Sequence, residues 1–219
     1  MNRLLFLLAL LLSFSAQADL HLAYNGFFAR MKKVQQPQYS DVTLTFALQG
    51  ITSAEPCRYY SLKLISDIHH VELDTAANGE ISLPYDEELK NSNAILQVLQ
   101  ADNTEACQVQ FRLRSKMRLP LNVDNNILEH YRAQFDALLD DMAGLGRYWL
   151  PEVTGVIVQL HSEDTVTDMD KAASDVTQCQ QQRCTVSLNQ LKSKAASWQF
   201  SQRPHYVQPL IAQPSEGEQ

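Results

Sequence analysis

The chain has 219 residues, of which 18 are Lys or Arg and 25 are Asp or Glu, for a formal net charge of −7. An acidic protein is a poor partner for a phosphate backbone, and the densest basic cluster is only Arg30, Lys32 and Lys33, so we expect no nucleic-acid partner. A chain of this length buries a core of its own without a structural metal.

The first 18 residues predict an export signal. Arg3 gives a basic start, Leu4 to Leu12 form an apolar run, and Ala16-Gln17-Ala18 fits a small-residue cleavage site. The run is too short to span a bilayer. We therefore expect cleavage after Ala18, a mature chain that begins at Asp19 and contains no membrane span, and an oxidising compartment outside the cytoplasm.

Short strands dominate the first half of the mature chain. Phe27, Phe28 and Met31 stand at helical spacing and are expected to be buried against the first sheet. Alternation of apolar and polar residues then predicts a small antiparallel sandwich, with a hairpin around Asn78-Gly79. The predicted strands cover residues 42–48, 57–66, 71–73, 81–85, 94–100 and 107–114, and residues 86–93 suit a helical turn.

The period changes between Asp124 and Tyr148. Apolar residues recur there every three or four positions, which predicts an amphipathic helix that Gly144, Gly146 and Pro151 bring to an end. The Asn126–Glu129 segment fits a capping box. Strand character returns over residues 155–161, 184–188 and 198–200, and residues 162–182 suggest a polar connection.

These patterns predict a mainly β protein with α structure (α+β), in which one or two small antiparallel sandwich-like modules flank a central amphipathic helix. The predicted organisation is a signal peptide over 1–18, an N-terminal β module over 19–122, a helix and connector over 123–150, a smaller C-terminal β module over 151–212, and a flexible tail over 213–219.

The two halves show a weak internal likeness. Tyr59–Asp67 resembles Val156–Asp164, and Gly79–Val98 resembles Cys184–Phe200, in the same order. Two related β modules would give such matches, and so would chance. We keep duplication as a hypothesis.

Four cysteines follow the signal. An even number in an exported chain favours two disulfides, for which three pairings exist. We favour Cys57–Cys107 and Cys179–Cys184, which close one loop in each half. The four residues between Cys179 and Cys184 do not form a C-x-x-C redox motif, and no neighbouring histidine or second cysteine pair suggests zinc.

Motifs with a known catalytic mechanism are missing from the sequence. It contains no G-x-S-x-G and no H-E-x-x-H, and we identify no catalytic, cofactor-binding or metal-ligating set. The candidate ligand or partner contacts are Tyr148, Trp149, Trp198 and His161. For both tryptophans we favour core positions over exposed binding positions.

Four segments together resemble a known family. LAYNGFFARMK, DVTLTFAL, ISLPYDEEL and DALLDDMAGLGRYWLPEVTGV are similar to the envelope proteins of Gram-negative bacteria grouped as domain of unknown function 2987. The resemblance implies export to the periplasm and a domain that fills the mature chain. It carries over no activity, cofactor or catalytic residue.

The sequence thus favours a periplasmic, non-enzymatic interaction or accessory module with a protein partner in the envelope. A protein that binds a small ligand or glycan in a cleft lined by Tyr148, Trp149 or Trp198 is one alternative. A hydrolytic enzyme of unrecognised type, with His161 beside a carboxylate, is another. The sequence does not specify the oligomeric state.

Overall fold

The computed structural model describes residues 19–102, 104–161, 165–191 and 195–212, so the predicted signal and the predicted tail lie outside the described residues. In the N-terminal half two antiparallel sheets form, with strand orders β1-β6-β3-β4 and β5-β2-β7. The elements are β1 (Leu20–Ala23), α1 (Tyr24–Val34), η1 (Pro37–Tyr39), β2 (Val42–Gly50), β3 (Tyr59–Ile65), β4 (His70–Glu72), β5 (Glu80–Ile81), α2 (Glu87–Asn91), β6 (Ile95–Gln100) and β7 (Cys107–Ser115).

The C-terminal half also contains two antiparallel sheets, with strand orders β10-β13-β8 and β11-β12-β9-β14. Its elements are β8 (Asn122–Asp124), α3 (Asn125–Ala143), η2 (Gly144–Trp149), β9 (Val153–Gln159), β10 (Val166–Met169), α4 (Lys171–Val176), β11 (Thr177–Gln180), β12 (Arg183–Val186), η3 (Leu188–Gln190), β13 (Ser197–Phe200) and β14 (Tyr206–Ile211). The predicted α+β class with a central amphipathic helix is confirmed.

Three local predictions were wrong. The predicted hairpin around Asn78-Gly79 is reduced to one antiparallel bridge between Thr75 and Ile81, because β4 pairs with β3 whereas β5 pairs with β2. The helix α3 is capped by Asp124, whose carboxylate accepts from the Ile127 amide at 2.9 Å, because β8 runs directly into the helix. The stretch predicted as a polar connection contains β10, α4 and β11.

The connectivity of the first half is repeated in the second. We match β1 with β8, β2 with β9 and so on in order up to β7 with β14. The first half contains the pairings β1–β6, β6–β3, β2–β5 and β2–β7. The second half contains their counterparts β8–β13, β13–β10, β9–β12 and β9–β14, and all eight pairings are antiparallel. In each half a helix follows the first strand without a break. The fifth pairing of each half differs, because β4 pairs with β3 whereas its counterpart β11 pairs with β12. The protein is therefore a tandem repeat in four of its five strand pairings, and α3 belongs to the second repeat.

Backbone contacts repeat as well. The Tyr24 amide at the start of α1 donates to the Ala94 carbonyl at 2.9 Å, and the Asn125 amide at the start of α3 donates to the Ala196 carbonyl at 3.0 Å. The predicted match of Gly79–Val98 with Cys184–Phe200 agrees with this topology. The other predicted match was wrong, because it aligned β3 with β9, whereas the sheet order places β9 in the position of β2.

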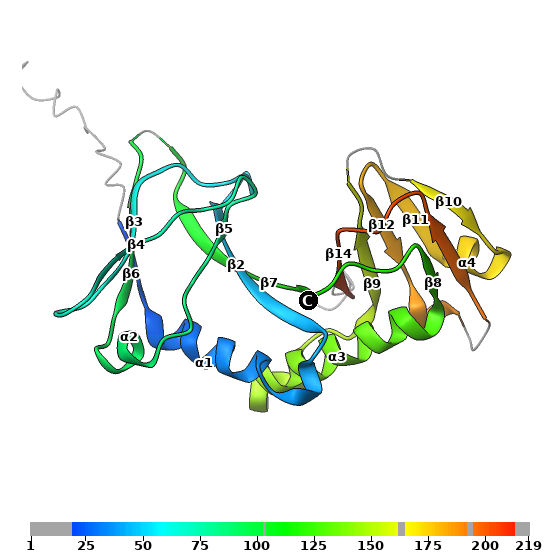
Figure 1. The fold of residues 1–219 in the computed structure, drawn as a ribbon, viewed down its shortest axis with the longest axis horizontal. Helices are drawn as coiled ribbons and strands as arrows, with labels where there is room; N and C mark the ends of the chain where they lie inside the picture. The colour runs from blue at the N-terminus through cyan, green and yellow to red at the C-terminus, as the bar shows by residue number, and fades with distance from the viewer. Residues whose placement is uncertain (1–18, 103, 162–164, 192–194, 213–219) are drawn as a thin grey trace, which may run out of the picture.

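Equivalent elements meet between the halves. The helix α1 contacts α3, and β7 contacts β14; Figure 1 shows both helices along one side of the molecule. One cluster of buried apolar residues includes members from both repeats. The two repeats therefore share a core.

Both predicted disulfides form. Cys57–Cys107 ties the start of β7 to the loop before β3, and Cys179–Cys184 bridges paired positions of β11 and β12. Within the described residues, the helices fall short of the length and apolar character that a bilayer crossing demands.

Candidate functional site

The second repeat carries an extension that the first lacks. The segment between β8 and β9 has 28 residues (125–152), whereas the segment between β1 and β2 has 18 (24–41). The last fully buried position of α3 is Leu138, Met142 still packs partly against the core, and the η2 turn that follows contains no buried residue. Four apolar residues at its end form what we call the η2 patch: Leu145, Tyr148 and Trp149 are 87%, 72% and 82% exposed, and Leu150 is 40% exposed.

Local sequence explains why the helix stops here. Gly144 adopts φ +57°, a conformation that side chains disfavour, and its amide closes the last turn of α3 on the Asp140 carbonyl. The following short 3₁₀ turn presents the aromatic residues to solvent. Arg147 orders Tyr148, because its Nη2 donates to the phenolic oxygen at 2.9 Å and its Cζ lies 4.9 Å from the ring centroid.

The base of the patch is anchored to the first repeat. The buried Tyr39 donates its hydroxyl to Asp141 Oδ2 at 2.7 Å, and the Lys33 ammonium contacts the Asp141 carbonyl. Burial raises the pKa of Tyr39, and the hydrogen bond to Asp141 raises it further, so the phenol remains a donor. The η2 patch thus extends from a fixed helix end.

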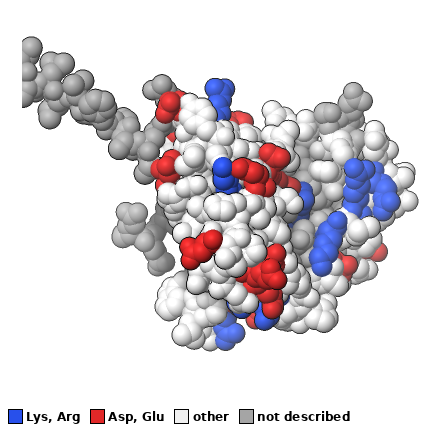
Figure 2. Space-filling model, turned by 60° about the vertical axis from the view of Figure 1, so that its left-hand side comes forward, with Lys and Arg blue, Asp and Glu red and all other residues white. Residues whose placement is uncertain are grey.

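Acidic residues surround the patch. Asp140, Asp141 and Glu152 are exposed within a few residues of it, and the basic residues beside them are Arg147 and Lys33, which contacts the Asp141 carbonyl. On the face that the N-terminal repeat turns to the viewer in Figure 2, acidic side chains are separated by uncharged surface, without a continuous basic area.

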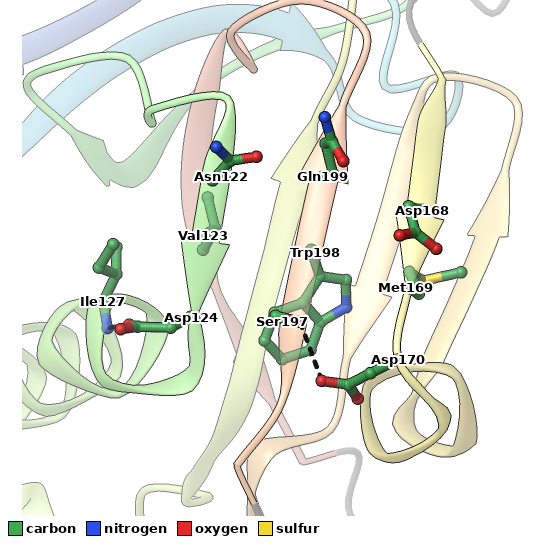
Figure 3. Close-up of a pocket in the computed structure, with 10 residues that line it drawn as sticks. All are labelled: Asn122, Val123, Asp124, Ile127, Asp168, Met169, Asp170, Ser197, Trp198 and Gln199. Carbon is green, nitrogen blue, oxygen red and sulfur yellow. Dashed lines mark hydrogen bonds between the residues drawn. The ribbon is translucent and has the colours of Figure 1, made fainter.

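Trp198 occupies a different environment. It is 2% exposed on β13, the middle strand of its sheet, and its indole Nε1 donates to Thr177 Oγ1 at 2.8 Å. Trp198 is among the residues of β8, β13 and β10 that line a pocket of about 350 Å³ (Figure 3). The predicted core position is confirmed for Trp198 and was wrong for Trp149, because only Trp198 lies on a paired strand.

Two of the three carboxylates that line this pocket, those of Asp124 and Asp170, accept hydrogen bonds from the backbone. Asp124 caps α3, and Asp170 caps α4 through the Ala173 amide at 2.8 Å and also accepts from Ser197 Oγ at 2.9 Å, as Figure 3 shows. The bond from the Ala173 amide is the main reason that the pKa of Asp170 is lowered. A carboxylate held in this way is not poised for general acid catalysis.

His161 lies against a second histidine. Its ring centroid is 4.8 Å from that of His205. Burial lowers the pKa of His205, and the charges of His161, Arg118 and Arg114 lower it further. The carboxylates Glu163 and Asp164, which the sequence places beside His161, lie outside the described residues.

The structure thus brings together two of the four predicted contacts, Tyr148 and Trp149, and separates them from Trp198, which is buried. The sequence analysis missed Leu145, Leu150 and the ordering role of Arg147. The glycines and the proline that end the helix could have indicated this exposed patch, because apolar side chains in a short irregular segment after a helix are not packed in a core. Across the described residues, no group of three or more His, Cys, Asp or Glu side chains is placed to hold a metal.

Comparison with known proteins gives a family and no activity. Neither the curated proteins nor the solved structures contain a significant match to the chain. The sequence model of a family described as "Protein of unknown function (DUF2987)" matches residues 16–160. This range ends just after β9, so the match includes the whole first repeat and the η2 patch. The chain belongs to the DUF2987 family.

Proposed function

We propose that the protein is a non-enzymatic interaction module of the bacterial cell envelope, exported to the periplasm and cleaved after Ala18, which docks a protein partner through the η2 patch. The observation that carries this proposal is the exposure of Leu145, Tyr148 and Trp149 on η2, a turn that contains no buried residue. Large apolar side chains on a solvated protrusion are typical of docking sites.

Independent features support the proposed compartment. Two disulfides and no free cysteine among the described residues fit an oxidising environment. The apolar run before Ala18 fits export. N-terminal sequencing of the protein purified from the periplasm should begin at Asp19.

The chemistry of the patch favours a protein over a lipid surface. Trp, Tyr and Arg are the residue types that contribute most to protein interfaces, and the patch combines Trp149, Tyr148 and Arg147. Exposed Asp140, Asp141 and Glu152 would be repelled by anionic headgroups. We expect the partner to offer an apolar pocket for Trp149 with basic residues at its rim.

Site-specific crosslinking in living cells tests this proposal. A photoreactive residue at position 148 should capture one dominant partner, whereas the same residue at Tyr60, 69% exposed on β3, should not. Trp149→Ala should remove the crosslink at position 148 without changing thermal stability. Equal capture at positions 148 and 60, or no capture at either, would overturn the docking role.

The Trp198 pocket supports a second candidate function, the binding of a small ligand or glycan. Its volume of about 350 Å³ suits a small molecule, and Gln199 and Asp168 line it beside Trp198. In a Trp149→Phe variant all tryptophan fluorescence comes from Trp198, so titration with peptidoglycan fragments should change the emission if the pocket binds them. An unchanged emission rules these ligands out.

A further inference from the structure

The tandem repeat allows equivalent positions of one chain to be compared. In the second repeat, the segment Ser115–Leu121 leads into β8 and lies along β14 and the turn before it. The Val207 amide of β14 donates to Ser115 Oγ at 3.1 Å, and Arg203 Nε donates to the Leu119 carbonyl at 3.2 Å. The Leu119 side chain is completely buried in the shared core. An extended segment with an aliphatic anchor therefore covers this position of the second repeat.

The equivalent position of the first repeat is an apolar groove of about 370 Å³, which we call the β1–β7 groove. It lies between β1 and β7, each at the edge of its sheet, and α1 forms its floor. Its apolar lining includes Leu20, Leu22, Phe27, Val109 and Phe111, of which Phe111 is the most exposed.

Among the described residues, no segment covers this groove in the way that Ser115–Leu121 covers its counterpart. The inference rests here on the proposed cleavage after Ala18, which leaves only Asp19 before β1. We propose that the β1–β7 groove receives an extended aliphatic segment of another polypeptide, which takes the place that Ser115–Leu121 takes in the second repeat.

The groove offers polar as well as apolar contacts to such a segment. Arg30 lines it, held by a 2.9 Å bond from Nη1 to the Gly26 carbonyl and by the Phe111 ring, whose centroid is 4.7 Å from Cζ. A guanidinium has five N–H donors, so further donors remain for a peptide carbonyl. In the second repeat, Arg203 donates such a hydrogen bond to the Leu119 carbonyl. Unpaired edges of β1 and β7 supply further backbone groups.

The chain itself provides the probe. The peptide SKMRLPL, with the sequence of residues 115–121, should bind to the mature chain 19–219 in a fluorescence anisotropy titration, with saturation below about 1 mM. The same peptide with Leu119→Ser should bind about tenfold more weakly, because the anchoring side chain is lost.

A filled groove should not bind the peptide. Gly26 lies in α1 and lines the groove, and a Cβ there would approach nothing closer than Arg30 Nη1 at 3.5 Å, so Gly26→Leu has room for its Cβ and adds an apolar side chain beside the groove. We expect at least about a tenfold loss of peptide affinity. The matched control is Gly146→Leu in η2, where the nearest atom is 3.9 Å away; this variant should bind like the parent protein.

Other outcomes would overturn the inference. Binding that persists in Gly26→Leu, or no saturable binding, removes the groove as the site. If the peptide binds only after residues 213–219 are deleted, the occupant is the chain's own tail. If the parent sediments as a dimer and Gly26→Leu as a monomer, the occupant is a second copy. Because the purified mature chain is used, failure here leaves the docking role of the η2 patch untouched, and loss of that role leaves peptide binding intact.

Discussion

The two tryptophans provide a matched test of the division between core and patch. A completely buried tryptophan removes about 150–250 Å² from water, which corresponds to at most about 4–6 kcal/mol. Trp198 is 2% exposed and also donates a hydrogen bond to Thr177. Trp198→Ala should therefore lower the free energy of unfolding by about 3–5 kcal/mol. Trp149 is 82% exposed, and Trp149→Ala should cost less than about 1 kcal/mol.

Urea unfolding of the mature chain with its disulfides intact, followed by circular dichroism, measures both costs. Fluorescence provides an independent readout because the chain contains two tryptophans. Acrylamide should quench the emission of a Trp198→Phe variant strongly and that of a Trp149→Phe variant weakly. A loss of more than about 2 kcal/mol in Trp149→Ala, or equal quenching of the two variants, would refute the assignment of Trp149 to an exposed patch.

Three further experiments test the fold. Gly155→Ala should destabilise the protein by about 3 kcal/mol or more in urea unfolding, because the new Cβ would clash with the Val186 backbone. The control Gly146→Ala should be nearly neutral. Equal effects of the two substitutions would contradict the register of β9. The pKa of Asp41 is lowered mainly by its hydrogen bond with His130, so Asp41→Asn should lower the urea midpoint at neutral pH. This loss of stability should shrink as the pH falls through the lowered pKa of Asp41. A loss that is the same at about pH 3 and pH 7 would exclude the pairing of Asp41 with His130. Replacing both Cys57 and Cys107 by serine should cost about 4 kcal/mol, since their bond closes a loop with a sequence separation of 50, and an unchanged midpoint would argue against the bond.

Elements with a strong period were predictable from the sequence. The helix α3 and the strands β2, β3, β6 and β7 have regular apolar positions, because one face of each is buried. The strands β10 and β11, with the sequences VTDM and TQCQ, have no buried residue, so no alternation marks them. They exist because β13 and β12 pair with them, and pairing is decided by the rest of the sheet rather than by the segment.

The candidate site shows the same limit. Composition identified Tyr148 and Trp149 as possible contacts, but it predicted a core position for Trp149 as well as for Trp198. The two tryptophans differ in their place in the topology. Trp149 ends the exposed turn that follows α3, and Trp198 lies on the middle strand of a sheet. For a similar reason, only one of the two predicted sequence matches between the halves was correct. Alternating strands such as β3 and β9 have similar sequences, and their pairing partners are needed to tell them apart.

The boundary of the family match gains meaning from the repeat. The match ends at residue 160, one residue after β9. In the structure β9 is an inner strand, and both of its partners, β12 and β14, lie beyond that boundary. An inner strand without partners exposes two unpaired edges, an arrangement that folded proteins avoid. The matched range therefore ends inside a folded unit. The second repeat is completed by residues up to Ile211. The η2 patch lies within the matched range, whereas α3, the helix that carries it, also packs against β14, which lies outside that range.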